Sequence, residues 1–249
     1  LRHRLPTLKY CVASGEALSP ELSRRFLAAL PGTVLLNLYG SSEASADSTF
    51  YEITAADTRF AGSVPIGKPI GNTQVFILDK NELPVPIGIP GELHIGGAGV
   101  SLGYLNRPDL NQRRFIKDPF RPDSLLFKTG DIGRYRPDGN IQILGRADDQ
   151  VKIRGMRVEL GEIETKMKQF DSVREAAVVI REETPASKII VAYVSSEIGS
   201  ALETELRAFL EQTLPEHMVP AFFVFVDALP KTTSGKVDRR ALREIKEYK

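Results

Sequence analysis

The sequence has little that points to covalent, redox or metal chemistry. Its single cysteine, Cys11, excludes an intrachain disulfide and fits a reducing compartment. The histidines at positions 3, 94 and 217 are scattered, without metal-ligand spacing or a neighbouring cysteine, so neither a zinc site nor a catalytic triad is indicated. The formal net charge of +1 gives no electrostatic case for binding nucleic acid or an anionic membrane.

Long apolar runs are also lacking. No run approaches the roughly 18 residues of a membrane-spanning helix, so no membrane span is expected. Residues 1–4 lack an apolar signal core, and the chain does not start with methionine. We therefore expect a cytoplasmic protein that is a fragment, or one module, of a longer chain. At 249 residues, 42% hydrophobic and 26% charged, the composition is that of one large or two medium globular domains.

The glycine-rich segments do not complete a phosphate-binding motif. GGAG at 96–99 fails the pattern GxGxxG because the next glycine, Gly103, comes one position late, so tight turns are the simpler interpretation. Gly235-Lys236 is followed by valine, which a P-loop does not allow. The tail around Lys236 is either a solvated basic surface or an anion clamp, and the residues by themselves favour the solvated surface.

The beginning of the chain predicts an α/β segment. Residues 8–13 and 34–38 are apolar runs typical of buried strands, and Ser19 is an N-cap followed by proline at the first helical position. A strand, helix, strand order predicts α/β. Glu43 follows the second strand, where a carboxylate is either a ligand-binding group or an exposed loop acid. The apolar face of the predicted helix consists of Leu22, Phe26, Leu27 and Leu30.

The middle of the chain predicts a β-rich subdomain. From about residue 64 to residue 103, glycine and proline separate short β-like runs and no helix fits. The predicted elements here and beyond are strands at 73–78 and 92–95, a short helix at 109–115, a strand ending in a tight turn at 127–131, and a strand at 141–144.

The segment 145–164, GRADDQVKIRGMRVELGEIE, predicts a polar joint followed by a hairpin. Its first five residues are small, polar or charged, as in a surface loop. Residues 150–154 and 156–160 alternate polar and apolar side chains, as half-buried strands do, and Gly155 supplies the turn. The joint is either a hinge between two halves or an ordinary loop in one rigid domain.

After the joint the pattern predicts an α+β half. Gly161 ends the second strand of the hairpin, and a helix begins at Glu162 with Ile163, Met167 and Phe170 on one face. Ser200 and Glu203 form a capping box. The other expected elements are strands at 175–180, 189–194 and 222–226, and a helix with Leu202, Leu206, Phe209 and Leu210 inward.

Six segments, in this order, resemble the adenylation domains of nonribosomal peptide synthetases, which belong to the adenylate-forming superfamily. They are SGEAL (14–18), NLYGSSE (37–43), GELHIGGAGVSLGYL (91–105), FKTGD (127–131), the segment 145–164, and LPKTTSGKVDRRAL (229–242). The resemblance covers essentially the whole chain, and the chain covers about the second half of the family's domain.

The resemblance implies a fold of α/β plus α+β parts. Residues 1–147 would be the C-terminal part of the large core domain, made of the α/β segment and the β-rich subdomain. Residues 148–249 would be a small, mobile α+β C-terminal domain that follows a hinge at Asp148.

The resemblance also implies a two-step reaction. A carboxylate attacks the α-phosphate of ATP, and a phosphopantetheine thiol on a carrier domain then attacks the acyl-adenylate. The implied cofactors are ATP and Mg²⁺. The implied partners are an amino acid, a peptidyl carrier domain and the upstream half of the adenylation domain, with no nucleic acid and no membrane. Such chemistry depends on positioning and charge neutralisation, which suits a chain without a histidine or cysteine constellation.

Nucleotide-binding roles follow from the same resemblance. Tyr39 would stack on adenine, Glu43 would hold Mg²⁺, and Asp131 would accept hydrogen bonds from the ribose hydroxyls. The other implied nucleotide-binding positions are Ser14, Gly15, Glu16, Ala17, Asn37, Gly40 and Arg146.

Three further roles fall on the joint and on the segment after it. Lys236 would bridge the substrate carboxylate and the α-phosphate, for which a compact ammonium is suited. Asp148 falls on the family's hinge and is the second residue assigned to catalysis, and Gly155 would line the path of the pantetheine thiol.

The positions that line the family's acyl pocket fall on Val12, Ser14, Leu38, Ala46 and Asp47. These residues are small with one charge, most like pockets for small hydroxylated amino acids such as serine. The alternative is that Asp47 pairs with a basic side chain of the substrate.

The chain departs from the family in two ways. Ser41-Ser42 stands where Pro-Thr is usual, and the small hydroxyl of Ser42 can replace threonine. The loop that binds the β- and γ-phosphates, and the aspartate that pairs with the substrate amine, lie upstream in the family and are absent here. We therefore expect no adenylate formation by this chain alone.

Two alternatives stay open. The first is an acyl- or aryl-CoA ligase fragment, although KIRGMRVELGEIE favours the peptide synthetase branch. The second is a non-catalytic fragment that docks carrier proteins through residues 149–249. The set Tyr39, Glu43, Asp131 and Lys236 argues against a decayed enzyme.

Overall fold

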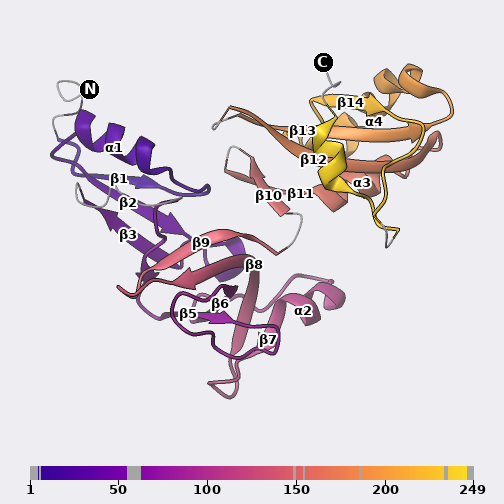
Figure 1. The fold of residues 1–249 in the computed structure, drawn as a ribbon. Helices are drawn as coiled ribbons and strands as arrows, with labels where there is room; N and C mark the ends of the chain where they lie inside the picture. The colour runs from indigo at the N-terminus through magenta and orange to yellow at the C-terminus, as the bar shows by residue number, and fades with distance from the viewer. Residues whose placement is uncertain are drawn as a thin grey trace. The chain divides into compact units, whose positions relative to one another are not determined.

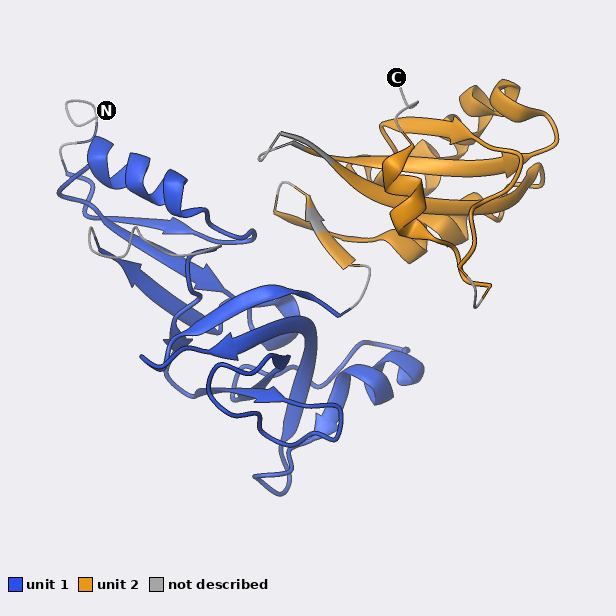
Figure 2. Cartoon of the chain, in the orientation of Figure 1, with its two compact units in different colours: residues 1–148 blue, residues 149–249 orange. Residues whose placement is uncertain are grey.

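The chain divides into two compact units, residues 1–148 and 149–249 (Figure 2). The computed structural model describes residues 5, 7–54, 63–147, 150–153, 155–184, 187–232 and 235–245. Asp148, the predicted hinge, lies outside the described residues. That the first unit ends a large core domain and the second is a small mobile domain stays a prediction.

The first sheet of unit 1 has the order β1-β2-β3-β4, and Figure 1 labels its first three strands. Strands β1 (Tyr10–Ala13) and β2 (Val34–Tyr39) pair in parallel, joined by helix α1 (Pro20–Ala29). Strands β3 (Thr49–Ile53) and β4 (Lys68–Pro69) follow in antiparallel pairing. The predicted strand, helix, strand order is therefore confirmed.

Helix α1 packs on one face of this sheet, and the set of side chains that it buries differs slightly from the prediction. Ser19 caps the helix, and its hydroxyl accepts from the amide of Leu22 at 3.1 Å. Leu22 was expected to point inward, but it is 54% exposed. The inward stripe instead follows helical spacing through Ser23, Phe26, Leu27 and Leu30, and Leu22 lies beside it.

Residues 64–103 form strands and loops without a helix, as predicted, and strands β5 and β6 of this segment belong to the second sheet of unit 1. Its core holds Val75, Ile77, Leu93, Ile95 and Ile141. The sheet has the order β5-β6-β8-β7, with β9 also on β8, and consists of β5 (Thr73–Leu78), β6 (Gly91–Gly97), β7 (Phe115–Lys117), β8 (Leu125–Tyr135) and β9 (Ile141–Arg146), with helix α2 (Pro108–Arg114) before β7.

Strand β8 corrects one prediction. A tight turn was expected to end it at 127–131, but it continues through Gly130, which has φ +78°. Glycine takes this left-handed conformation without a Cβ clash, and the register shifts against β9 between Ile132 and Gly133. The chain therefore bends without leaving the sheet, and Asp131 lies opposite Arg146 in mid-strand.

Unit 2 begins with the predicted hairpin and continues as a three-stranded sheet with helices on both faces (Figure 1). Side chains of β12 alternate: Ala176 and Val178 face the cluster that includes α3 and α4, whereas Ala177 and Val179 face Leu242 of α5. The elements are β10 (Gln150–Ile153), β11 (Met156–Glu159), α3 (Leu160–Met167), β12 (Val173–Thr184), β13 (Ser187–Ser196), α4 (Glu203–Thr213), β14 (Phe222–Phe225) and α5 (Arg239–Glu244).

Two helix starts in unit 2 differ from the predictions. Gly161 lies inside α3, which starts at Leu160, because a glycine without a positive φ does not stop a helix. The capping box at Ser200 does not form: Ser200 lies within a 3₁₀ turn at Gly199–Leu202, and α4 begins directly after it. Among the described residues, no helix is both long and apolar enough to span a bilayer.

Candidate functional site

Two loops meet at one edge of the first sheet of unit 1. Because β1 and β2 are parallel, the loops that follow them, residues 14–17 and 40–47, start side by side. The second loop folds back tightly. A Cβ on Gly40 would lie 1.8 Å from the carbonyl oxygen of Ala46, so only glycine fits there.

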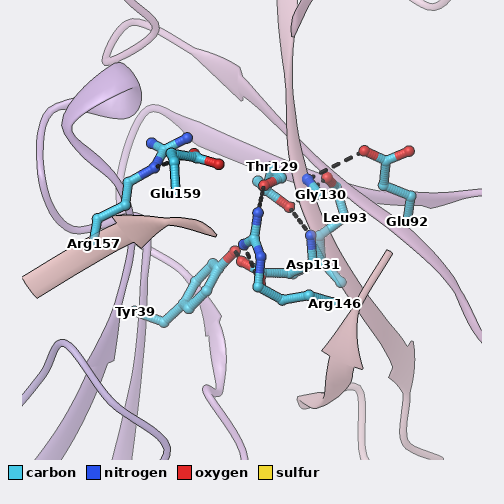
Figure 3. Close-up of polar contacts among 9 residues, drawn as sticks. All are labelled: Tyr39, Glu92, Leu93, Thr129, Gly130, Asp131, Arg146, Arg157 and Glu159. Atoms are coloured by element: carbon cyan, nitrogen blue, oxygen red, sulfur yellow. Dashed lines mark hydrogen bonds and ion pairs between the residues drawn. The ribbon is translucent and has the colours of Figure 1, made fainter. Parts of the chain in front are cut away.

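A hydrogen-bonded cluster joins this edge to the second sheet (Figure 3). The hydroxyl of Tyr39, the last residue of β2, donates to Oδ2 of Asp131 at 2.5 Å. Nη1 of Arg146 donates to Oδ1 of the same carboxylate at 2.7 Å. The pKa of Tyr39 is raised well above its ordinary value, mainly by burial and next by the negative charge of Asp131. The phenol therefore stays protonated and donates the hydrogen bond.

Two residues that sequence reasoning missed accept hydrogen bonds from the backbone amides of Gly130 and Asp131. Thr129 Oγ1 accepts from the Asp131 amide at 3.0 Å and donates to the Leu93 carbonyl at 2.9 Å. Glu92 Oε1 accepts from the Gly130 amide at 3.1 Å. Thr129 belongs to FKTGD, but nothing in the sequence indicated that its hydroxyl would fix the bend. The carboxylate of Asp131 is thus preorganised.

Glu43 is a second buried carboxylate at the same edge. It is 6% exposed in a short 3₁₀ turn after β2, and the hydroxyl of Tyr104 donates to its Oε1 at 2.5 Å. Its carbonyl accepts from the Ser101 amide at 2.9 Å. The partner Tyr104 was not foreseen, since it lies 61 residues away in the sequence. Across the described part of the chain, no group of three or more His, Cys, Asp or Glu residues could hold a metal ion.

The predicted pocket residues flank this edge. Val12 and Leu38 share a face of the sheet, because Val12 pairs with Leu36, two residues before Leu38. Val12 is 52% exposed, whereas Leu38 is half-buried. Ala46 has φ +69° in the loop after β2, and Asp47 follows it half-buried. That these residues line one pocket stays a prediction.

Asn37 is buried and holds the backbone, and its predicted contact with the nucleotide stays a prediction. It is 2% exposed, and its Nδ2 donates to the carbonyl of Pro65 at 2.9 Å. Ser14, Glu16 and Ala17 are exposed in the loop after β1, and Gly15 has φ +91°.

The remaining predicted residues belong to unit 2. Gly155 has φ +77° at the turn of the hairpin, where Ile153 pairs with Met156. Lys236 is exposed, and its ammonium makes no hydrogen bond or ion pair within the described ranges. Its backbone carbonyl accepts from the amide of Thr232 at 2.7 Å.

Family models match both units. A model described as AMP-binding enzyme matches residues 1–105, and one described as AMP-binding enzyme C-terminal domain matches residues 162–236. The chain belongs to the AMP-binding enzymes. These two matches, together with the relatives described next, confirm the resemblance to adenylation domains of nonribosomal peptide synthetases and the mixed α/β fold.

Relatives in the family are peptide synthetases. Surfactin synthase subunit 2 of Bacillus subtilis (strain 168) is 45% identical over 236 residues, which are 95% of this chain and 6% of that protein. A solved structure of an NRPS protein containing adenylation and PCP domains is 31% identical with a TM-score of 0.83, over 96% of this chain and 40% of that one.

A third similarity is to the Vibrio cholerae adenylation domain AlmE in complex with glycyl-adenosine-5'-phosphate. It is 28% identical with a TM-score of 0.82, over 97% of this chain and 45% of that one. This AMP-binding chain spans between 3% and 9% of the length of the curated relatives.

Proposed function

We propose that this chain is the C-terminal half of an amino-acid adenylation domain. Such a domain activates an amino acid with ATP as the acyl-adenylate and passes it to the phosphopantetheine thiol of a carrier domain. The observation that carries the proposal is the cluster of Tyr39, Asp131 and Arg146, which unites three positions that the family assigns to the nucleotide.

The cluster fits a nucleoside. Asp131 receives one hydrogen bond on each oxygen, and an ionised carboxylate offers about four acceptor sites, so it can still accept from ribose hydroxyls. The aromatic ring of Tyr39 offers a stacking face for a purine, worth about 1–3 kcal/mol. Arg146 would neutralise phosphate charge nearby. The backbone of residues 14–17 would run along the base.

The surroundings of Glu43 fit a hard cation on the nucleotide phosphates. A single buried carboxylate is enough where phosphates supply further oxygen ligands to Mg²⁺. When bound there, the cation neutralises charge on the phosphates. Tyr104 fixes the direction of the carboxylate by donating to Oε1.

Unit 2 would supply the mobile parts. The ammonium of Lys236 would contact the substrate carboxylate and the α-phosphate during adenylation. Gly155 would line the thiol path. Asp148 would be the hinge, so that Asp148→Pro impairs one half-reaction far more than the other.

The partners follow from the same proposal. The AMP-binding relatives are peptide synthetases, and one similar solved structure joins adenylation and PCP domains. We therefore expect a peptidyl carrier domain as partner and a cytoplasmic location. Val12, Ser14, Leu38, Ala46 and Asp47 would favour a small amino acid such as serine.

The deciding experiment is amino-acid-dependent pyrophosphate exchange by the adenylation domain completed with its upstream half. We expect exchange with one or a few small amino acids, and none with the 249-residue chain alone. A folded, complete domain that binds ATP but shows no exchange with any amino acid contradicts the proposal. Steady exchange by the isolated chain contradicts the expected dependence on the upstream half.

A further inference from the structure

Backbone contacts join the described residues on the two sides of Lys236. Lys231 and Val237 form an antiparallel bridge at the base of this segment. Within it, the Thr232 amide donates to the Lys236 carbonyl at 2.7 Å, and the Gly235 amide donates to the Thr232 carbonyl at 2.9 Å. We call the described residues of this segment, 231, 232 and 235–237, the lysine turn. The position of the ammonium therefore depends on what holds the base of this turn to the rest of unit 2.

On one side, the base is held by a network around Arg239, the first residue of α5. Nη1 of Arg239 donates to the Val178 carbonyl at 2.5 Å and lies 2.8 Å from Glu164 Oε1. Nη2 donates to Glu164 Oε2 at 3.1 Å, and Glu164 Oε1 also accepts from the Val178 amide at 2.8 Å. The side chains of Arg239 and Glu164 are 24% and 14% exposed. This fork-on-carboxylate geometry ties α5 to α3 and β12 in a fixed orientation.

On the other side, the base is held by a weaker contact. Lys231 Nζ lies 2.6 Å from Glu175 Oε1, but these side chains are 48% and 38% exposed. An exposed lysine pair contributes little, because solvent screens it and the long side chain loses entropy. Of these two ion pairs, the Arg239 network is therefore the stronger anchor, and buried Leu229 adds apolar packing on the Lys231 side.

Helix α5 has further supports that do not involve Arg239. Asp238 Oδ1 accepts from the amides of Arg240 and Ala241, both at 3.0 Å, and Leu242 is fully buried. Removing the Arg239 side chain should therefore loosen the orientation of α5 and of the lysine turn without unfolding the unit.

We infer that Arg239 and Glu164 are positioning residues for Lys236. By fixing the C-terminal base of the lysine turn to α3 and β12, they fix where the ammonium is presented. The inference rests on the role that the proposed function gives to Lys236. Positioning at this level matters, because a misplacement of about 1 Å costs roughly 100-fold in rate.

The first test measures positioning in the 249-residue chain, without catalysis. In Arg239→Ala, hydrogen exchange at the amides of Thr232 and Gly235 should accelerate about tenfold or more, as loss of a charge-assisted hydrogen bond gives. Glu164→Gln, which keeps shape and one acceptor, should show a smaller acceleration and serves if Arg239→Ala does not fold.

Arg207→Ala is the matched control. Arg207 also binds a carboxylate, Glu203 at 3.0 Å, and a backbone carbonyl, that of Pro220 at 2.9 Å, but it lies on α4 and joins that helix to the segment before β14. Its removal should leave exchange in the lysine turn unchanged. Unchanged exchange in both Arg239→Ala and Glu164→Gln overturns the inference, as does equal acceleration in Arg207→Ala.

The second test uses the completed adenylation domain. Arg239→Ala should lower kcat of adenylation about 10- to 100-fold with KM for ATP within about threefold, and thiol transfer from a preformed adenylate should be spared. Arg239→Lys should recover only part of the loss, since lysine cannot reproduce the bidentate contact.

The outcomes separate the inference from the proposed function. A purely structural role would lower both half-reactions together and in step with Tm, which overturns positioning. A loosened lysine turn with unchanged adenylation overturns the assigned role of Lys236, and with it the catalytic part of the inference. Pyrophosphate exchange by the unmodified domain tests the proposed function independently of either variant.

Discussion

Asp131 in unit 1 is 9% exposed and receives hydrogen bonds from two side chains, whereas Lys236 in unit 2 is exposed and its ammonium has none within the described residues. The first group is fixed by strand pairing and by contacts on both of its oxygens. The second is fixed only through its backbone. The difference fits two tasks: a preorganised carboxylate holds a ligand in one geometry, while an exposed ammonium is available to an anion that arrives later.

The largest effect on the rate of adenylation should come from removing the exposed ammonium of Lys236. In the completed domain, Lys236→Ala should slow adenylation by at least about 100-fold, since a charge-assisted contact of about 1.5–3 kcal/mol and the alignment of two anions are both lost. Thiol transfer from a preformed adenylate should change much less. Pyrophosphate exchange and single-turnover thiol loading measure the two steps.

Lys231→Ala is the control for that variant. Lys231 lies in the same turn but pairs with Glu175 at an exposed position, so its loss should change adenylation less than about threefold. Similar losses in the two variants, or a Lys236→Ala protein that fails only in thiol transfer, would show that the lysine has another role.

The next effect concerns the fixed carboxylate. Asp131→Asn should raise the KM for ATP about 10- to 100-fold, because the amide removes the charge that faces Arg146 and half of the acceptor capacity proposed for the ribose. Asp118→Asn is the matched control. Asp118 is 6% exposed and accepts from the Phe120 and Arg121 amides, so its change should lower stability without shifting KM. Equal KM shifts would remove Asp131 from the nucleotide site.

A smaller effect, on the magnesium requirement, is expected when Glu43 loses the hydroxyl of Tyr104 that orients it. Tyr104→Phe should raise the Mg²⁺ concentration needed for half-maximal activity about 3- to 10-fold, since about 1 kcal/mol of orientation is lost. Tyr135→Phe is the control, because Tyr135 donates to the Val75 carbonyl at 2.6 Å instead. A magnesium titration of both variants decides, and an unchanged requirement in Tyr104→Phe argues against Glu43 as a ligand.

The smallest effect is on stability at high pH. The pKa of Tyr39 is raised in the folded chain by burial and by Asp131, so its stabilising contribution is complete below the ordinary tyrosine pKa of about 10 and is lost as pH rises above it. The loss should approach about 1.4 kcal/mol per pH unit. Urea unfolding of the wild-type chain and of Tyr39→Phe between pH 8 and pH 11 measures it. Parallel curves would show that Tyr39 titrates normally.

Local patterns were enough for much of the fold. The N-cap at Ser19 and the hairpin turn at Gly155 were predicted from their own neighbours in sequence, and both formed. Motif order was enough to gather Tyr39 and Asp131 into one site. Predictions were wrong where the same local pattern is compatible with two structures. Gly130 bends a strand that was expected to end, and Ser200 lies in a 3₁₀ turn instead of capping a helix.

The sequence by itself determined the family, the candidate residues and most of the element order, because periodicity, capping and motif order depend on neighbouring positions. It did not reveal strands β3, β4 and β7 or helix α5. Only the tertiary structure decided the partners of those residues. Tyr39 and Asp131 are 92 residues apart, and Glu164 and Arg239 are 75 apart. Contacts over such separations depend on strand register and on which face of a sheet each helix covers, and neither is encoded in a single local pattern.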